Sequence, residues 1–335
     1  MNKDIKKQND FGADFQRYHF TNESWKITAN EIKVEPSNLK SENRTLESIV
    51  SLEDPHFKIS KNKKGKFSFE VLNNKPEVLN FLINTSRIHW QKELSIEKGR
   101  SNLTSPDLSP DENQEQIDHL VNKIYTIGYL LHEYKDESKA WAVYSMDCRL
   151  FDNGKGFGRH GKSLLFDQLI PFFKRKYYLN GMSSYFHSSR YTYSGLENGA
   201  NYVLIDDARK DFDITNLYNC ITSDWLVNIP GNSPYTIPFE NSPKISILSN
   251  FRPKTINESA NRKVLYTMFS DYYHESIEGI YKDRFTVIDD FGGPIFIEYW
   301  DEEETNTFIN FMMQCLSFYL GCDEKINPPM KNLKR

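Results

Sequence analysis

The chain has 335 residues, of which 38% are hydrophobic and 26% are charged, and its net charge is -4. This balance is typical of a folded globular protein and excludes a disordered polyelectrolyte. None of the four cysteines stands in a C-x-x-C pair, and the longest apolar stretch, residues 311–320, is too short to span a bilayer. We therefore expect reduced thiols in a cytoplasmic protein with no membrane segment and no export signal.

The first hundred residues carry more lysine and arginine than acid, although the chain as a whole is acidic. Apolar and polar residues alternate over 56–71, around a turn that contains Lys61, Lys63 and Lys64. This pattern predicts a β-hairpin, and a helix after it would complete a winged-helix-like accessory domain over residues 1–110. The basic turn would then contact DNA, but a solvated hairpin turn accounts for the same charges.

Residues 95–115 are rich in serine, proline, asparagine and charged residues, which marks a linker. Apolar residues then recur at helical spacing over 116–134, so we expect a helical connector or oligomerisation segment over 111–135. Residues 136–298 would form the main domain, and 299–335 a C-terminal helical segment.

The segment Gly156-Phe-Gly158-Arg-His-Gly161-Lys162-Ser163 fits G-x-x-x-x-G-K-[ST], the phosphate-binding loop of P-loop NTPases. Its glycines allow backbone N–H groups to curl around an anion, and the helix after the loop directs its positive end at the phosphates. Lys162 would reach the β- and γ-phosphates of ATP, and the Ser163 hydroxyl would ligate Mg²⁺.

The surroundings of this loop support that interpretation. A buried strand is expected over 141–145, before the loop, and a helix that breaks at Pro171 is expected after it. Short apolar strands and helical stretches alternate from there on. This alternation favours an α/β fold with a parallel sheet and helices on both of its faces.

Two acids, Asp206 and Asp207, come directly after the apolar run Tyr202-Val-Leu-Ile. This is the pattern of a buried central strand whose end enters a site. Asp206 would belong to the Mg²⁺ shell, and Asp207 would orient or deprotonate the attacking water. A strand that ends in a solvated Asp pair would look the same, but the phosphate loop upstream favours a hydrolytic site.

A second apolar run, Lys244-Ile-Ser-Ile-Leu-Ser, ends in Asn250. If this strand lies beside the strand that carries the acids, the amide of Asn250 faces the γ-phosphate, where it can orient water and report hydrolysis. A turn asparagine at a strand end is the alternative.

Together, these motifs resemble the superfamily 3 helicases, the AAA+-related group found in virus, phage and plasmid replication proteins. The resemblance covers roughly residues 115–300 and is closest to the helicase part of phage and mobile-element primase-helicases. It implies an α/β fold of the P-loop NTPase (AAA+-like) type, with a three-layer αβα core, a small α+β N-terminal domain and C-terminal helices. It also implies a hexameric ring that hydrolyses ATP between subunits, moves on single-stranded DNA and works with a primase or replication initiator.

The resemblance assigns Walker A roles to the glycine loop with Lys162 and Ser163, Walker B roles to the two acids, and a sensor role to Asn250. In this family an arginine finger comes after the sensor and reaches into the neighbouring subunit's site. Such a guanidinium neutralises the charge that develops on the transferred phosphoryl group. Arg262 is our choice and Arg252 the second, with a surface arginine as the alternative reading of either.

One departure from the family concerns DNA. The family usually places a hairpin with a DNA-gripping lysine or histidine between the acids and the asparagine. Here residues 211–243 contain no Lys, Arg or His, although residues 228–239 still resemble a hairpin. The grip would have to come from Tyr235 or Phe239 stacking on bases, with Lys210 or Lys244 at the hairpin base.

The sequence therefore predicts an ATP-dependent DNA helicase or translocase of superfamily 3 type, with ATP and Mg²⁺ as cofactors. Because the hairpin lacks cations, an ATP-switched ring that recruits a replication or defence partner without unwinding DNA is the main alternative. A monomeric P-loop kinase for a small molecule, without an arginine acting in trans, is a third.

Overall fold

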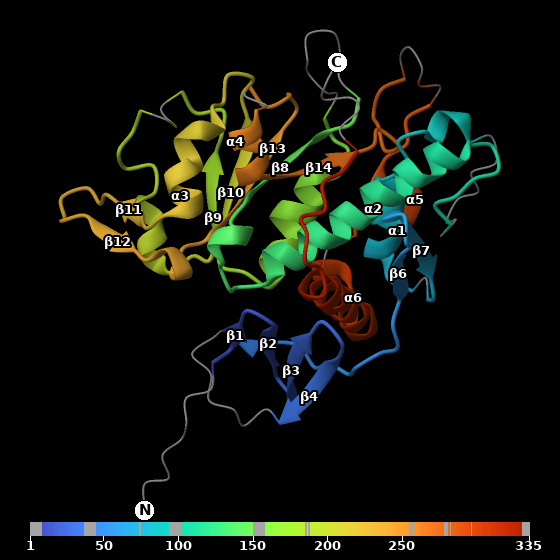
Figure 1. Ribbon diagram of the computed structural model, residues 1–335, viewed down its shortest axis with the longest axis horizontal. Helices are drawn as coiled ribbons and strands as arrows, with labels where there is room; N and C mark the ends of the chain where they lie inside the picture. The colour runs from blue at the N-terminus through green and yellow to red at the C-terminus, as the bar shows by residue number, and fades with distance from the viewer. Residues whose placement is uncertain are drawn as a thin grey trace, which may run out of the picture.

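A computed structural model of the protein describes residues 9–36, 45–73, 75–93, 102–149, 158–184, 186, 188–254, 257–277, 281, 283–295 and 297–329. Its centre is a sheet of five strands in the spatial order β14-β8-β13-β10-β9, and every neighbouring pair is parallel (Figure 1). The strands are β8 (Ala142–Asp147), β9 (Lys176–Asn180), β10 (Tyr202–Ala208), β13 (Lys244–Ser249) and β14 (Val264–Phe269). The predicted α/β class with a parallel sheet is confirmed.

The strand order places β13 between the two strands that carry the main motifs. Strand β13 pairs with β8 on one side and with β10 on the other, so the strand that leads to the phosphate loop and the strand that carries the two acids are not neighbours. Every residue of β8, β13 and β14 is buried, which explains their nearly continuous apolar sequences.

Helices cover both faces of the sheet. Alternate strand residues face two separate apolar clusters, with Val143 and Leu204 in one and Ala142 and Val203 in the other. The first face packs against α2 (Pro110–Leu131), α6 (Glu302–Leu320) and the helix after the phosphate loop. The second packs against the short helices η5 (Ser194–Asn198), η6 (Ile214–Leu217) and α3 (Tyr218–Thr222).

The N-terminal region contains a sheet that the sequence analysis did not predict. Its strands are β1 (Phe11–Gly12), β2 (Phe15–Phe20), β3 (Glu23–Thr28), β4 (Ile32–Pro36) and β5 (Thr45–Leu46). The sheet lies below α6 in Figure 1, and Ser317 Oγ of α6 donates to the carbonyl of Thr28 at 2.7 Å. Trp25 and Ile27 on β3 alternate with polar residues and pair with Val34 and Ile32 on β4, so a hairpin pattern was present but was not recognised in this largely polar region.

The hairpin predicted over 56–71 is confirmed as β6 (Phe57–Lys61) and β7 (Phe67–Val71), and α1 (Glu77–Asn84) and η1 (Trp90–Lys92) come after it. The ring of Phe57 lies 5.7 Å from that of Phe311 in α6, and Gln114 of α2 donates to the carbonyl of Phe67. The hairpin and α1 therefore share one apolar core with α2 and α6.

The remaining elements are short. They are η2 (Glu137–Lys139), η3 (Leu164–Leu169), η4 (Ile170–Phe172), β11 (Trp225–Val227), β12 (Tyr235–Ile237), η7 (Phe239–Asn241), α4 (Glu258–Lys263), α5 (Val287–Phe291) and η8 (Ile297–Tyr299). None of the helices in the described part of the chain has the length and apolar content that a membrane span needs.

Helix α2 begins at Pro110, six residues before the apolar periodicity starts at Gln116 and one residue before the predicted helical segment 111–135. The reason is a capping box: Ser109 Oγ accepts from the Glu112 amide, while the Glu112 carboxylate accepts from the Ser109 amide. Pro110 occupies the first turn, where its missing N–H costs nothing. The residues just before 116, which the composition assigns to a linker, thus form the first turn and a half of the longest helix.

Helices α2 and α6 cross at Gly128. A Cβ at this position would lie 2.3 Å from the carbonyl oxygen of Cys315 and 2.5 Å from Cβ of Tyr319. Backbone at that distance cannot move aside, so only glycine permits this contact.

We expect Gly128→Ala to lower the free energy of unfolding by about 1–3 kcal/mol, because the added methyl group forces α2 and α6 apart. Gly293→Ala is the matched control, since its Cβ meets nothing within 4 Å, and it should stay within about 0.5 kcal/mol of the parent. Urea unfolding measures both. Equal stability of the two variants would show that the α2–α6 contact is looser than described.

Candidate active site

The phosphate loop adopts the conformation that its glycines permit. Gly158 has φ 76° and Gly161 has φ 90°, and Arg159 between them also has a positive φ of 61°. A Cβ on Gly161 would lie 2.5 Å from the buried ring of Phe81. Phe81 belongs to α1, so this helix packs directly against the phosphate loop. Gly156 lies outside the described residues.

A helix begins directly after the loop. It starts at Lys162 and Ser163, continues as the π-helical η3 and ends in the single tight turn of η4, which contains Pro171. The predicted break at this proline is confirmed, since the ring removes one donor and fixes φ.

Asp206 and Asp207 sit at a bulge near the end of β10. The pairing of β10 with β13 slips by one residue there, and Asp207 has φ 52°, a conformation that costs energy outside glycine and is tolerated best by Asn and Asp. The Asp207 amide donates to Asp206 Oδ1 at 3.0 Å. Burial, together with the negative charge of Asp207, raises the pKa of Asp206, while the Asp207 side chain is exposed.

Asn250 comes directly after β13, which does lie beside the strand of the acids. Lys162 Nζ donates to Asn250 Oδ1 at 3.1 Å, and a Cβ on Gly158 would lie 3.3 Å from Asn250 Nδ2. The asparagine thus contacts the phosphate loop from the strand beside the acids.

A cavity of about 560 Å³ joins these groups. The predicted residues that line it are Gly158, Gly161, Lys162, Ser163, Asp206, Asp207 and Asn250. They come from three separate stretches of sequence, and they meet because parallel strands place their carboxyl ends at one edge of the sheet.

The opposite wall of the cavity was not predicted from the sequence. It is formed by Glu275, by Thr286, Val287 and Ile288 at the start of α5, and by Pro294 and Ile295. Ile288 is 58% exposed, which is unusual for a large apolar side chain. No motif marks this wall, because its residues meet the phosphate loop only through the tertiary fold.

Asp147 was also missed, although it has a recognisable signal. It is the last residue of β8 and ends an apolar strand directly before the phosphate loop, as Asp206 does near the end of β10. Its carboxylate is fully buried and forms an ion pair with Lys162. Burial alone would raise the pKa of Asp147, but the charge of Lys162 and the neighbouring His160 outweigh it and hold that pKa below the usual range.

The candidate arginines lie outside this cavity. Arg262 is exposed in the last turn of α4, and Arg252 is partly buried two residues after Asn250. Neither lines the cavity of its own chain.

The hairpin predicted near 228–239 exists as β11 and β12 and lies at the opposite, amino-terminal edge of the sheet. Tyr235 lines a cavity of about 380 Å³ there, together with Lys174 and Lys244. Lys135 Nζ lies over the ring of Phe239, 4.5 Å from the ring centre. Burial, together with repulsion from Lys174 and Lys135, lowers the pKa of Lys244 well below its usual value. Lys244 was expected at the hairpin base and lies there, Lys135 and Lys174 join it from other segments, and all three lysines are buried.

The three lysines of the basic turn are exposed between β6 and β7. Lys61 lies 3.6 Å from the Glu324 carboxylate and 5.5 Å from the centre of the Phe67 ring. Lys63 and Lys64 extend the turn beyond it.

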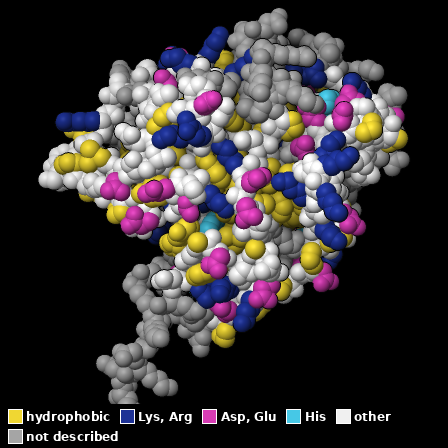
Figure 2. All heavy atoms as spheres, in the orientation of Figure 1, with side chains coloured by type: hydrophobic (Ala, Val, Ile, Leu, Met, Phe, Trp, Pro, Cys, Tyr) yellow, Lys and Arg dark blue, Asp and Glu magenta, His cyan; other side chains and the backbone are white. Residues whose placement is uncertain are grey.

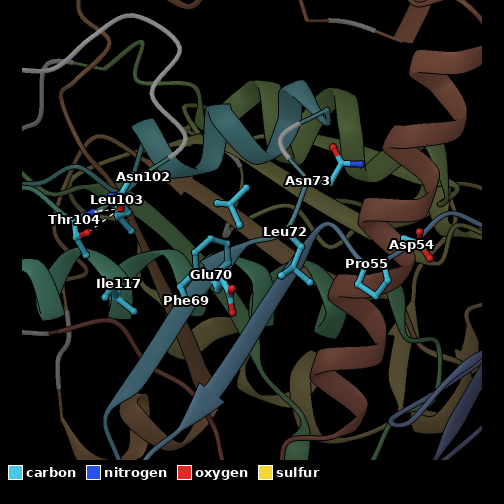
Figure 3. Close-up of a pocket in the computed structure, with 11 residues that line it drawn as sticks. Asp54, Pro55, Phe69, Glu70, Leu72, Asn73, Asn102, Leu103, Thr104 and Ile117 are labelled. Carbon is cyan, nitrogen blue, oxygen red and sulfur yellow. Dashed lines mark hydrogen bonds between the residues drawn. The ribbon is translucent and has the colours of Figure 1, made fainter.

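A larger cavity, of about 850 Å³, lies between β7, α2 and residues 102–104 (Figure 3). Its lining combines apolar side chains such as Phe69, the carboxylates of Asp54 and Glu70, and neutral polar residues such as Asn102, and it includes no Lys, Arg or His. Because it has two carboxylates and no cation, the smaller cavity is the better candidate for phosphate chemistry.

Ser163 and Asp206 supply oxygen ligands of the kind that Mg²⁺ prefers, and a nucleotide's phosphates and water would complete the shell. The residues present therefore fit a magnesium ion that arrives with the nucleotide. Within the described ranges, no three or more His, Cys, Asp or Glu side chains are grouped so as to hold a metal ion.

Comparison with known proteins gives no family. No family model and no curated protein matches the chain. Among solved structures, the apo A form of the NrS-1 C-terminal region is similar at 14% identity over 96% of this chain and 70% of that one, with a TM-score of 0.36. A JCV helicase bound to a thiazolopyridine compound is similar at 11% identity over 58% of this chain and 46% of that one, with a TM-score of 0.28. TM-scores this low carry no argument about function, which has to rest on the site.

We expect Lys162→Ala to destabilise the nucleotide-free protein by about 3 kcal/mol at neutral pH, because it leaves the Asp147 carboxylate buried without its cation. The loss should shrink as the pH falls toward 4. In the parent, the depressed pKa of Asp147 stabilises the fold above the unfolded value of 3.8. In the variant, burial raises that pKa, so protonation on acidification removes the penalty. Urea unfolding at several pH values, with the exposed Lys63→Ala as control, measures this, and a loss independent of pH would contradict it.

Proposed function

We propose that this protein binds ATP with Mg²⁺ and hydrolyses it as the motor of a ring-forming DNA helicase or translocase of superfamily 3 type. One observation supports the proposal above all: an ammonium, a hydroxyl, two carboxylates and an amide from three segments line one cavity beside a glycine loop. This combination matches what phosphoryl transfer requires, which is positioning and charge stabilisation rather than covalent chemistry.

Each of these residues would have a separate role in ATP binding or hydrolysis, according to its position in the site. Lys162 starts the helix after the loop and would hold the β- and γ-phosphates, while Ser163 and Asp206 would hold Mg²⁺, which neutralises phosphate charge when bound. Asp207 is exposed at the bulge and would orient the attacking water and accept its proton. Asn250 contacts Lys162 and would sense the γ-phosphate from the neighbouring strand.

A second subunit would complete the site. Arg262 is exposed and lies outside its own chain's cavity, as a residue that acts on a neighbour's nucleotide must be. An arginine supplied in trans stabilises the charge of the transition state and makes hydrolysis depend on assembly. A ring of identical chains repeats this head-to-tail contact until it closes.

The ring's partner is single-stranded DNA in this proposal, contacted by Tyr235 on β12 and by the basic turn at Lys61, Lys63 and Lys64. Aromatic stacking on bases needs no cation on the hairpin itself. On the face drawn in Figure 2, basic and acidic side chains are interspersed rather than gathered by sign, so any electrostatic contact would be local.

One observation favours an ATP-switched assembly protein instead. The hairpin segment contains acids but no bases, and Leu226 on β11 is 57% exposed. An exposed apolar side chain beside acids suits a protein partner, such as a primase or replication initiator, better than a nucleic acid.

We expect Asp207→Asn to lower kcat for ATP hydrolysis by about 10²- to 10⁴-fold and to leave nucleotide affinity within a few-fold, because the amide cannot accept a proton. Phosphate release and equilibrium binding measure the two effects. The same preparations are tested for unwinding of a forked duplex. Parent protein that hydrolyses ATP but neither responds to single-stranded DNA nor unwinds would favour the assembly protein, and absence of hydrolysis would overturn both.

Mixing variants tests Arg262. Arg262→Ala and Lys162→Ala should each be inactive, but an equal mixture should recover up to about a quarter of the parent rate, because some interfaces then pair an intact loop with an intact arginine. A mixture of Lys162→Ala with Asp207→Asn is the control and should stay inactive, since both defects lie in the same chain's half of the site. Co-assembly without recovery would exclude Arg262 as the finger.

A further inference from the structure

The described part of the phosphate loop contacts a carboxylate of the protein itself. Asp147 has 0% exposure, and three groups of the loop converge on it. Its Oδ1 forms the ion pair with Lys162 and lies 3.0 Å from His160 Nδ1, while its Oδ2 accepts from the Gly158 amide at 3.2 Å. The loop thus directs an ammonium group and a backbone amide at an anion that belongs to the protein itself.

Two of these groups are ones that a nucleotide would need. Lys162 is only 6% exposed, and the partners of its ammonium are Asp147 and Asn250 Oδ1, both supplied by the sheet. The Gly158 N–H belongs to the set of amides that would cradle a phosphate, yet it donates to Asp147. A phosphate would therefore have to compete for both donors.

Competition between a phosphate and the Asp147 carboxylate would lower the affinity for nucleotide. A carboxylate and a triphosphate held near the same ammonium repel each other, and this repulsion is strong where water is largely excluded. Releasing Lys162 from Asp147 would also leave a buried carboxylate with fewer partners. A stabilising contact in the empty protein is thus a penalty on nucleotide binding.

We propose that Asp147 is a positioning residue that takes the place of a phosphate at Lys162 and Gly158, and that a nucleotide must displace it from both donors. This inference rests on the proposed nucleotide binding. Removing the charge of Asp147 should therefore raise the affinity for nucleotide. If Asp147 had only a structural role, its substitution would lower that affinity instead.

The test is calorimetric titration with MgADP and with a non-hydrolysable MgATP analogue. Asp147→Asn keeps the shape and should lower the dissociation constant by about 10-fold or more, a change of about 1.4 kcal/mol. The variant should also be less stable than the parent before nucleotide is added, because Lys162 loses its partner. Asp211→Asn, a substitution of equal charge change at a side chain that is 69% exposed, should alter neither property.

The outcomes separate the two claims. If the parent binds no nucleotide, the proposed function fails. If the parent binds and Asp147→Asn binds equally or more weakly, only the role of Asp147 fails.

Should Asp147→Asn not fold, the unmutated protein still decides. Hydrogen exchange resolved to Gly158 should show a protected amide before nucleotide is added, because Asp147 accepts its hydrogen bond. A Gly158 amide that exchanges freely in the empty protein would overturn the proposal.

Discussion

Strand β13 pairs in parallel with both β8 and β10, and this pairing brings Asp147, Asn250 and Asp206 to one edge of the sheet. Lys162, at the end of the glycine loop, lies at the same edge, where it contacts Asp147 and Asn250. This strand order brings together the residues that line the cavity. The bulge at the acids lies at the same edge, and α1 packs against Gly161 of the loop there. A shift of β13 would separate the phosphate loop from the residues that act on phosphate.

Charged side chains are buried at the same edge, and each buried charge there is compensated by a direct neighbour. Lys162 and Asp147 compensate each other, Asn250 adds a neutral acceptor, and Asp206 and Asp207 face the cavity, where a cation would be needed. Buried pairs contribute little net stability compared with apolar packing, so this arrangement is better explained by function than by folding. The stability of the protein comes instead from the shared apolar core of α2, α6 and the sheet, which includes residues of the N-terminal region.

Local signals predicted much of the site. The glycine loop, the acids after an apolar run and the asparagine after another are each contiguous in sequence, and the placement of β13 beside β10 is ordinary α/β packing. Asp147 carries the same signal as Asp206, but the expected strand stops at residue 145, so the acid at its end was overlooked. The start of α2 was placed too late because serine and proline indicated a linker, whereas here they form a helix cap.

Other features depend on contacts that no local pattern encodes. The wall at Thr286–Ile288 reaches the phosphate loop only through the tertiary fold, and two of the lysines at the base of the hairpin, Lys135 and Lys174, are far away in sequence. The N-terminal sheet was not foreseen because its alternating apolar residues, among them Trp25, stand in a largely polar stretch of sequence and share their core with α6.

The central claim is that the cavity at the carboxyl edge binds a nucleoside triphosphate through Lys162. Equilibrium titration of the parent with a fluorescent, non-hydrolysable ATP analogue in the presence of Mg²⁺ tests it most directly. The account predicts saturable binding that unlabelled ATP displaces and that Lys162→Ala abolishes in a variant shown to be folded. Absence of binding by the parent, or equal binding by the folded variant, would contradict it.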